Sequence, residues 1–143
     1  MARAPDTSNL GFLLAKASQR WNERLGEGFA AAGHPGVRPS YGSVLLPLWE
    51  EDGLRMGQLA ERARLSKQTM TTLVRLCERD GLVERSPDPE DGRATVVTLT
   101  PLAQDLRGVA ADVVARIERD VAARLGAAGK RALAEALGEV MEM

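Results

Sequence analysis

The sequence predicts a mainly α-helical protein that carries one small β-hairpin. Apolar side chains recur at steps of three and four residues along most of the chain, which is the spacing of one helix face. Aromatic residues make up only 3% of the 143 residues while hydrophobic residues make up 44%, so the core must be aliphatic. Two short strand-like runs flank the turn-forming residues 86–93. These observations disfavour an all-β sandwich.

The first predicted element is a helix that begins at Ser8. Residues 1–7 contain Pro5 and no apolar pattern, so we expect a frayed tail, and Ser8 is a residue type that caps helices. One apolar stripe then continues for about five helical turns. Its members are Leu10, Leu14, Ala17, Trp21 and Leu25. A stripe of this length needs an apolar partner.

A second helix is predicted from Ser40 toward Asp52. Glycines and prolines between positions 33 and 39 end the first helical pattern, and Ser40 can cap the next helix. Pro47 lies beyond the first turn, where it removes one backbone hydrogen bond and should bend the helix. The residues that indicate burial of this segment are Leu45, Leu46, Leu48 and Trp49.

Residues 55–80 are predicted to form a helix-turn-helix. The short first helix has an inner face of Leu59, Ala60 and Ala63. Leu65 supplies the turn, and Ser66 is the N-cap of a helix that continues to Asp80. The inner arc of this second helix consists of Met70, Leu73, Val74 and Cys77. Cys77 is therefore expected to be a buried apolar residue and not a redox sensor.

The outer face of the second helix is polar and cationic. Its members are Gln68, Thr71, Thr72, Arg75 and Arg79, with Lys67 at the flank. In helix-turn-helix proteins the amino-terminal half of this helix meets base edges in the major groove. A winged helix that binds protein should instead carry apolar residues here. The polar face therefore favours DNA over two alternatives, a winged-helix dimer for protein–protein interaction and a ligand sensor without DNA binding.

A hairpin follows Gly81. Residues 82–85 and 94–99 are the predicted strands, and Asp91-Gly92 is a favourable turn dipeptide between them. Arg93 stands beside the tip. A hairpin that directly follows a helix-turn-helix makes the predicted fold a winged helix-turn-helix.

The carboxyl-terminal part of the chain is predicted to form two further helices. Thr100 and Pro101 are an N-cap and first-turn pair, and a stripe continues through Leu102, Leu106, Val109, Val113, Ile117 and Val121. A last helix over 127–141 follows Gly126 and Gly129, with Leu133, Leu137, Val140 and Met141 on one side. The terminal stripes are longer than one winged helix can cover, which predicts a homodimer. We expect a dimerisation segment over 1–36, a DNA-binding lobe over 37–100 and dimerisation helices over 101–143.

Composition argues against several functional classes. One cysteine and one histidine provide no catalytic constellation and no metal site, and no cofactor is expected. There is no apolar run of membrane-spanning length and no signal segment, so we expect a cytosolic protein without a membrane partner. The net charge of −1 gives no global sign of nucleic-acid binding, so the local placement of cations must decide.

Three motifs in the expected order resemble the MarR family of bacterial transcriptional regulators. They are the capped helix SKQTMTTLV, the strand GLVER, and a hairpin with Asp91-Gly92-Arg93 that ends in Leu99-Thr100. The resemblance covers the chain from about Leu10 onward. It implies a homodimer whose two recognition helices enter successive major grooves of a near-palindromic operator in double-stranded DNA, with repression as the usual outcome. Ala103 and Pro47 depart from the family pattern.

The resemblance also implies the residues that contact DNA. By matching position, the recognition-helix contacts are Ser66, Lys67, Gln68, Thr69, Thr71, Thr72 and Arg75. Arg93 matches the wing arginine of the minor groove, and Asp91 is expected to hold Arg93 or another arginine in place. Arg55, at the start of the short helix, is expected to meet a backbone phosphate.

All the aromatic residues lie in the first 49 positions. One interpretation is core and dimer packing, and the other is a pocket for a small aromatic or apolar ligand between the terminal helices and the DNA-binding lobe. Its candidate lining is Phe12, Trp21, Tyr41 and Trp49. His34 lines this pocket or lies in a polar turn.

Overall fold

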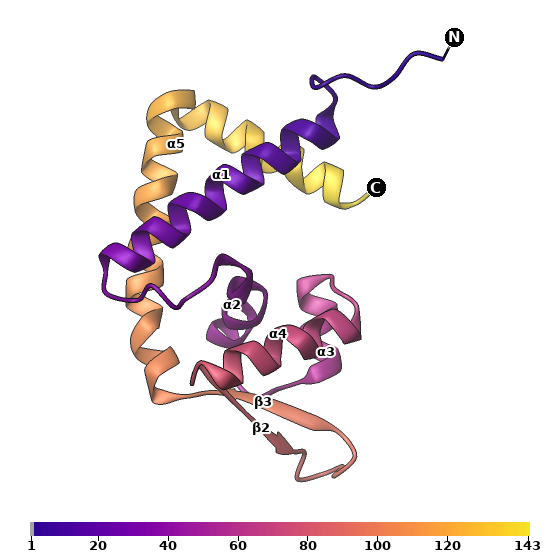
Figure 1. Ribbon diagram of the computed structural model, residues 1–143, viewed down its shortest axis with the longest axis vertical. Helices are drawn as coiled ribbons and strands as arrows, with labels where there is room; N and C mark the ends of the chain where they lie inside the picture. The colour runs from indigo at the N-terminus through magenta and orange to yellow at the C-terminus, as the bar shows by residue number, and fades with distance from the viewer. Residues whose placement is uncertain (1) are drawn as a thin grey trace. The chain divides into compact units, whose positions relative to one another are not determined.

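The computed structural model describes residues 2–143, and their elements are shown in Figure 1. Two compact units divide the chain. The terminal unit combines the segment that ends at Leu25 with Ala111–Met143, and the central unit is Gly26–Ala110. The elements are α1 (Leu10–Ala31), a 3-10 helix η1 (Pro39–Tyr41), α2 (Gly42–Glu50), β1 (Leu54–Arg55), α3 (Met56–Ala63), α4 (Lys67–Arg79), β2 (Val83–Pro87), β3 (Thr95–Leu99) and α5 (Pro101–Met141).

The core of the central unit lies between α2, α3 and α4. Leu59 of α3 is fully buried, as are Met70, Val74 and Cys77 on the inner face of α4. Leu45 and Leu48 of α2 join the same cluster. The predicted helix-turn-helix is confirmed, because apolar residues at helical spacing bury one face of each short helix.

The hairpin belongs to a three-stranded antiparallel sheet in the order β1-β3-β2. β1 was not predicted from the sequence, and in it Leu54 pairs with Val97 and Arg55 with Val96. A strand of two residues is too short to show an alternating pattern. β2 also continues to Pro87, opposite Thr95, which is two residues beyond the predicted end.

Both predicted caps of the first two helices are wrong. α1 begins at Leu10, and the Asn9 side chain accepts a hydrogen bond from the Phe12 backbone N–H at 3.0 Å, while Ser8 bonds with Asp6. Ser40 lies inside η1, which starts at Pro39 and precedes α2. The start of α1 is thus set by the side chain of Asn9, and the start of η1 by Pro39 in its first turn.

Two further expectations about apolar side chains need correction. Leu46 is 57% exposed, because it lies on the side of α2 opposite its buried residues. Leu102 is 44% exposed at the start of α5, where Ala103 and Leu106 are buried instead.

α5 consists of two helices that meet at Gly126. This glycine has φ 76° and ψ 163°, a conformation that residues with a Cβ rarely adopt. The helix beyond it changes direction sharply (Figure 1). At the other end, Thr100 Oγ1 accepts a hydrogen bond from the Ala103 backbone N–H at 3.3 Å, which confirms the predicted cap.

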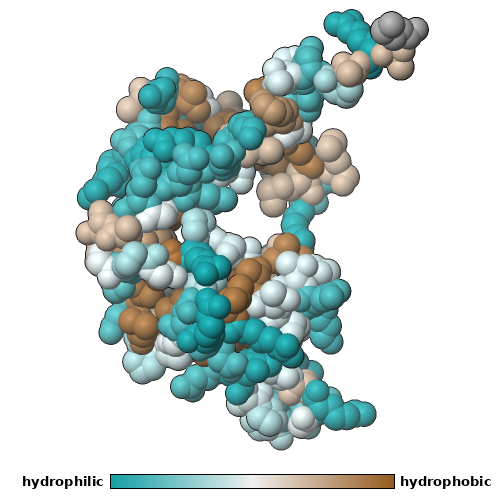
Figure 2. Space-filling model, in the orientation of Figure 1, coloured by the Kyte–Doolittle hydropathy of each residue, from teal (hydrophilic) through white to brown (hydrophobic). Residues whose placement is uncertain are grey.

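The terminal unit exposes many large apolar side chains. Figure 2 shows brown, apolar side chains on this part of the chain. Those on α1 are Leu10, Phe12, Leu13 and Leu14, and those on the second half of α5 are Leu125, Leu133, Leu137, Val140 and Met141. Arg24 and Asp120 form an ion pair at 2.5 Å within the same unit. Over residues 2–143, no helix has the length and apolar character required to span a membrane.

Cys77 is a buried cysteine whose thiol is a weak acid. The side chain is fully buried, and this burial, followed by the nearby Asp80 charge, raises the pKa of the thiol to about 12. The reactive species toward oxidants and alkylating agents is the thiolate. The structure therefore confirms the expected burial of Cys77, and the absence of a redox role stays a prediction.

We expect Cys77 in the folded chain to react with a thiol reagent at mildly alkaline pH roughly a thousandfold more slowly than in the denatured chain, because its thiolate fraction is so small. Mass spectrometry of timed samples measures both rates, and the denatured chain is the control. Rapid modification of the folded chain would contradict this prediction and would restore a redox role.

Candidate nucleic-acid interface

The start of α4 is fixed by its cap. Ser66 Oγ accepts a hydrogen bond from the Thr69 backbone N–H at 3.1 Å, as the sequence predicts, and lies 2.8 Å from Thr69 Oγ1. The turn before it depends on Arg64, whose φ of 55° is left-handed, and on the Leu65 backbone N–H, which donates to the Ala60 carbonyl at 3.0 Å. These contacts hold the first turn of α4 at a defined angle to α3.

The outer face of α4 is exposed and polar. Lys67, Gln68, Thr72 and Arg75 are exposed, and Thr71 is half-buried. The Thr71 and Thr72 hydroxyls donate to the carbonyls of the residues four positions earlier, at 2.8 and 3.2 Å. The hydroxyl hydrogens of both threonines are therefore engaged within the helix, which leaves their oxygens able to accept hydrogen bonds.

Contacts with charged side chains hold the end of α4. Asp80 accepts a hydrogen bond from the hydroxyl of buried Tyr41 at 2.5 Å and from Arg79 Nε at 3.1 Å. The bonds from Arg79 and then Tyr41 lower the pKa of Asp80. Arg85 of β2 binds Glu78 through two nitrogens at 3.0 to 3.2 Å, which lowers the pKa of Glu78. Arg79 is exposed, as predicted for the outer face, and it is also paired within the chain.

The wing loop is residues 88–94. The Asp88 backbone N–H donates to the Ala94 carbonyl at 2.9 Å and closes the loop, while a turn runs from Asp91 to Ala94, whose N–H donates to the Asp91 carbonyl at 2.9 Å. Gly92 and Arg93 are its central residues, so Asp91 comes one position earlier in the turn than the sequence suggested. Asp91 Oδ1 accepts from the Arg93 backbone at 3.1 Å and lies 3.3 Å from Arg93 Nε. The Arg93 side chain is 94% exposed at the tip.

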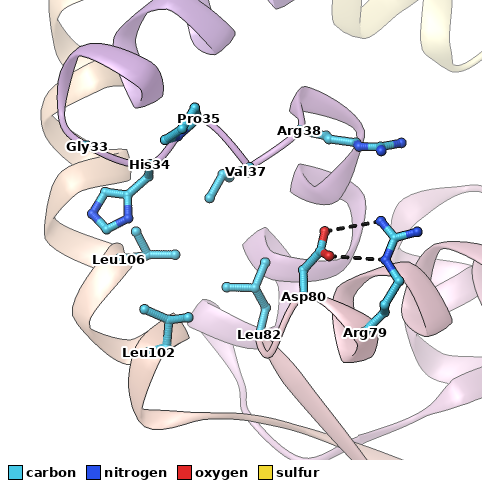
Figure 3. Close-up of a pocket in the computed structure, with 11 residues that line it drawn as sticks. Gly33, His34, Pro35, Val37, Arg38, Arg79, Asp80, Leu82, Leu102 and Leu106 are labelled. Atoms are coloured by element: carbon cyan, nitrogen blue, oxygen red, sulfur yellow. Dashed lines mark hydrogen bonds and ion pairs between the residues drawn. The ribbon is translucent and has the colours of Figure 1, made fainter.

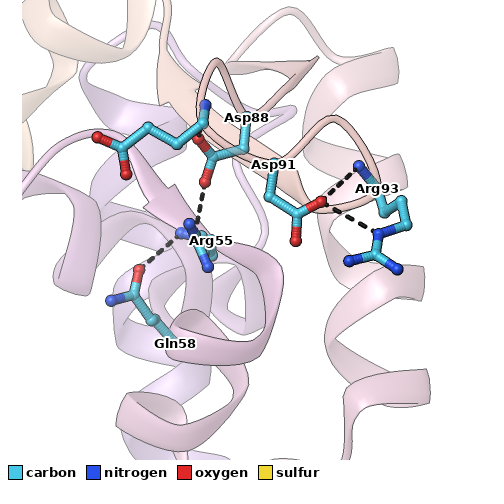
Figure 4. A network of polar contacts seen from close by, with 6 residues as sticks. Arg55, Gln58, Asp88, Asp91 and Arg93 are labelled. Atoms are coloured by element: carbon cyan, nitrogen blue, oxygen red, sulfur yellow. Dashed lines mark hydrogen bonds and ion pairs between the residues drawn. The ribbon is translucent and has the colours of Figure 1, made fainter.

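Arg55 contacts the wing. Figure 4 shows its guanidinium directed at Asp88, and Nε lies 2.6 Å from Asp88 Oδ2. The Arg55 backbone N–H donates to Gln58 Oε1 at 2.9 Å, at the start of α3. Asp88 was not anticipated, because no sequence pattern shows that an aspartate in a loop rich in acids and prolines will be buried.

A pocket of about 550 Å³ lies within the central unit (Figure 3). Its lining comes from the loop after α1, the end of α4 and the start of α5, namely Gly33, His34, Pro35, Gly36, Val37, Arg38, Arg79, Asp80, Leu82, Leu102 and Leu106. His34 therefore lies both in a turn and at the pocket.

None of the aromatic residues named from the sequence lines this pocket. Tyr41 belongs to the core, and the Trp49 indole N–H donates to the Ala103 carbonyl at 3.0 Å. Phe12 and Trp21 lie on α1 in the terminal unit. Tyr41 instead contributes indirectly, since its hydroxyl bonds with the pocket residue Asp80.

Comparisons with known proteins identify relatives of part of the chain. A family model described as the MarR family matches residues 36–94. The transcriptional regulator TtmR of Methylorubrum extorquens is 38% identical over 77 residues, which cover 54% of this chain and 39% of the relative. The organic hydroperoxide resistance transcriptional regulator of Bacillus subtilis is 32% identical over 75 residues, covering 52% of this chain and 50% of the relative. Each match thus spans half or less of the relative's own length.

Solved structures match over nearly the whole chain. A probable transcriptional regulator from Pseudomonas aeruginosa has a TM-score of 0.82 at 26% identity and covers 93% of this chain and 97% of its own. The PcaV regulator of Streptomyces coelicolor, in complex with its natural ligand, has a TM-score of 0.83 at 22% identity, covering 99% and 98%. The repressor CouR, bound to a 23-mer DNA duplex, has a TM-score of 0.81 at 24% identity, covering 97% and 99%. With the helix-turn-helix and wing described above, these matches show that the chain shares the fold of these transcriptional regulators, and its central part resembles the MarR family model.

Proposed function

We propose that this chain is a homodimeric transcriptional regulator that binds double-stranded DNA in a sequence-specific manner and acts as a repressor. The observation that carries the proposal is the exposed polar face of α4 beside a wing whose arginine is 94% exposed, both in the central unit. Phosphate contacts position such a protein, and base contacts specify its site. We assign it no catalytic activity and a cytoplasmic location, as is usual for transcriptional regulators.

The chemistry of the exposed side chains fits both kinds of contact. Arg75 can bind the two major-groove acceptors of guanine, and Gln68 can bind adenine through its donor and acceptor. Lys67 and the Ser66–Thr69 turn can meet phosphate oxygens, and the methyl groups of Thr71 and Thr72 can contact thymine. Arg93 has the reach to enter a neighbouring minor groove.

Local charge resolves the objection raised by the net charge of −1. Lys67 and Arg75 make no ion pair with any of residues 2–143, whereas Arg79 and Arg85 are paired with Asp80 and Glu78. Only unpaired cations gain fully from phosphate, because they release counterions on binding. Lys67 and Arg75, on the face that we propose for contact, are therefore available to DNA phosphates.

A second copy of the chain is the proposed partner of the terminal unit. The apolar side chains of α1 and of α5 after Gly126 would stay in water in a monomer, and contiguous apolar surface of this kind marks an interface. Residues 1–36 and 101–143 are then the dimerisation segments and 37–100 the DNA-binding lobe. Two lobes held together favour a near-palindromic operator. The match to CouR, solved with a DNA duplex, supports this arrangement.

We also infer that a small ligand releases the operator. The pocket combines Leu82, Leu102 and Leu106 with the cationic Arg38 and Arg79, which suits an apolar molecule with an anionic group. Arg79 is bonded to Asp80 at the end of α4, so an anion that competes for Arg79 would loosen that end of the helix. The match to PcaV, solved with its natural ligand, supports a ligand-responsive regulator.

Selection of bound fragments from random DNA tests the regulator itself, and we expect an enriched inverted repeat.

On that repeat, Arg75→Ala should cost about 1–3 kcal/mol of binding free energy and relax one base preference, because a base contact is lost. Arg93→Ala should weaken binding with less change in preference. Fluorescence anisotropy measures both, and Arg107→Ala, an exposed arginine of α5, is the charge-matched control. Without an enriched repeat the repressor proposal fails, and equal losses from Arg75→Ala on all sequences would deny its base-reading role.

Leu133→Glu tests the homodimer. Leu133 is 44% exposed on the second half of α5, and a glutamate there would put charge into the proposed apolar interface. We expect a folded monomer by sedimentation equilibrium and a loss of operator affinity of more than about tenfold, because two lobes no longer bind as one unit. Leu46→Glu, at a position 57% exposed on α2, should remain dimeric. A dimeric Leu133→Glu variant would disprove this interface.

Titration with a panel of aromatic carboxylates tests the ligand pocket. We expect at least one compound to raise the melting temperature and to lower operator affinity. Arg38→Ala should remove both effects while leaving ligand-free operator binding within about twofold, because Arg38 lines the pocket and lies outside α4 and the wing. Compounds that bind and stabilise the chain without any change in operator affinity would refute the proposed coupling.

A further inference from the structure

Asp88 is unusual because it is the only charged residue that is buried among residues 2–143, with 8% exposure. Its carboxylate has two partners. Oδ1 accepts from the Glu90 backbone N–H at 2.9 Å, and Oδ2 lies 2.6 Å from Arg55 Nε. The Glu90 bond, together with the Arg55 charge, holds the pKa of Asp88 below its usual value. A buried carboxylate persists only where such contacts compensate its lost hydration.

Asp88 controls the base of the wing. Its backbone N–H closes the loop by bonding to the Ala94 carbonyl, and its carboxylate holds the Glu90 backbone on the near side of the tip. Arg93 lies between these two points, in the turn that starts at Asp91. The direction in which Arg93 leaves the wing loop is therefore determined by the contacts that Asp88 makes on the two sides of the loop.

Arg55 connects this base to the helix-turn-helix. It is the last residue of β1, pairs with Val96 of β3, and immediately precedes α3. The side chain of Leu59 in α3 packs in the same buried cluster as Met70 of α4. The Arg55–Asp88 pair thus joins the wing to the element that supports the recognition helix, as Figure 4 shows for the side chains themselves.

We propose that Arg55 is a positioning residue, which pairs with Asp88 to anchor the wing and thereby sets where Arg93 meets DNA. The inference rests on the proposed function and adds to it a role for Arg55 other than the phosphate contact expected from sequence. An arginine whose charge is balanced by a carboxylate 2.6 Å away releases few counterions.

The two roles predict opposite effects for Asp88→Asn. This substitution removes a negative charge close to DNA, so a phosphate-binding Arg55, freed from its partner, would raise operator affinity. If Asp88 anchors the wing, Asp88→Asn should lower operator affinity about tenfold, because the wing is released. Glu90→Gln removes the same charge from an exposed side chain of the same loop and should change affinity by less than about twofold. An affinity of Asp88→Asn equal to or above the wild type would overturn the proposal.

A double-mutant cycle tests whether Arg55 acts through Arg93. Arg55→Ala should weaken operator binding about tenfold in the wild type but less than about twofold in an Arg93→Ala background, and Arg55→Lys should restore most of the loss. The slope of log operator affinity against log salt concentration should correspond to about one phosphate contact fewer in each single variant. The double variant should show no further decrease. If the two substitutions instead lowered operator affinity independently, and the salt slope of the double variant showed two phosphate contacts fewer, Arg55 would be a phosphate ligand.

Hydrogen exchange of the chain without DNA separates this inference from the proposed function. Amides of residues 88–94 should exchange faster in Asp88→Asn and Arg55→Ala, while those of α4 keep their protection. Unchanged wing exchange would refute the anchor even if DNA binds. Failure of the wild type to select any DNA sequence would refute the regulator and leave the anchor supported by this measurement alone. Loss of protection throughout α4 would show general unfolding and also count against a specific anchor.

Discussion

The burial of one face of α4 is the constraint on which the rest of the structure depends. Met70, Val74 and Cys77 are fully buried against α2 and α3, and exposure of Met70 or Val74 alone would cost about 1.5–3 kcal/mol. A helix held in this way cannot rotate about its axis without exposing them. The opposite face is therefore permanently in solvent, and Gln68 and Arg75 are presented in one fixed orientation. Recognition on this helix is a consequence of its packing.

Packing fixes the rotation of α4, but polar contacts fix its ends and its neighbours. Ser66 caps the first turn, Asp80 joins the last turn to buried Tyr41, and Glu78 joins it to Arg85 of β2. The Arg55–Asp88 pair extends the same scheme to the wing. A contact between charged groups at a half-exposed position contributes little to global stability, but it can select one geometry among several of similar energy.

Sequence periodicity predicted the helices, the helix-turn-helix and the inner face of α4, because burial imposes a regular spacing on many residues at once. Periodicity failed where a single residue or a very short segment determines the local structure. Asn9 caps α1 in place of Ser8, Leu46 is on the exposed side of α2, and β1 is too short to have a pattern. Asp88 and the lining of the pocket depend on contacts between distant segments, which local propensity does not encode. The polar face of α4 was predictable, whereas the partners that neutralise Arg79 and Arg55 were not.

These internal pairs also affect how a chain with a net charge of −1 would bind DNA. Most DNA-binding proteins obtain part of their affinity from a basic surface, which attracts DNA of any sequence through counterion release. Here Arg55, Arg79 and Arg85 are each balanced by an acid, so the non-specific attraction of one lobe is small. Under the proposed function, a greater share of the affinity must then come from correctly placed base contacts and from two lobes binding together. Residues that fix the geometry of the lobe would then influence operator choice through the residues that touch the bases.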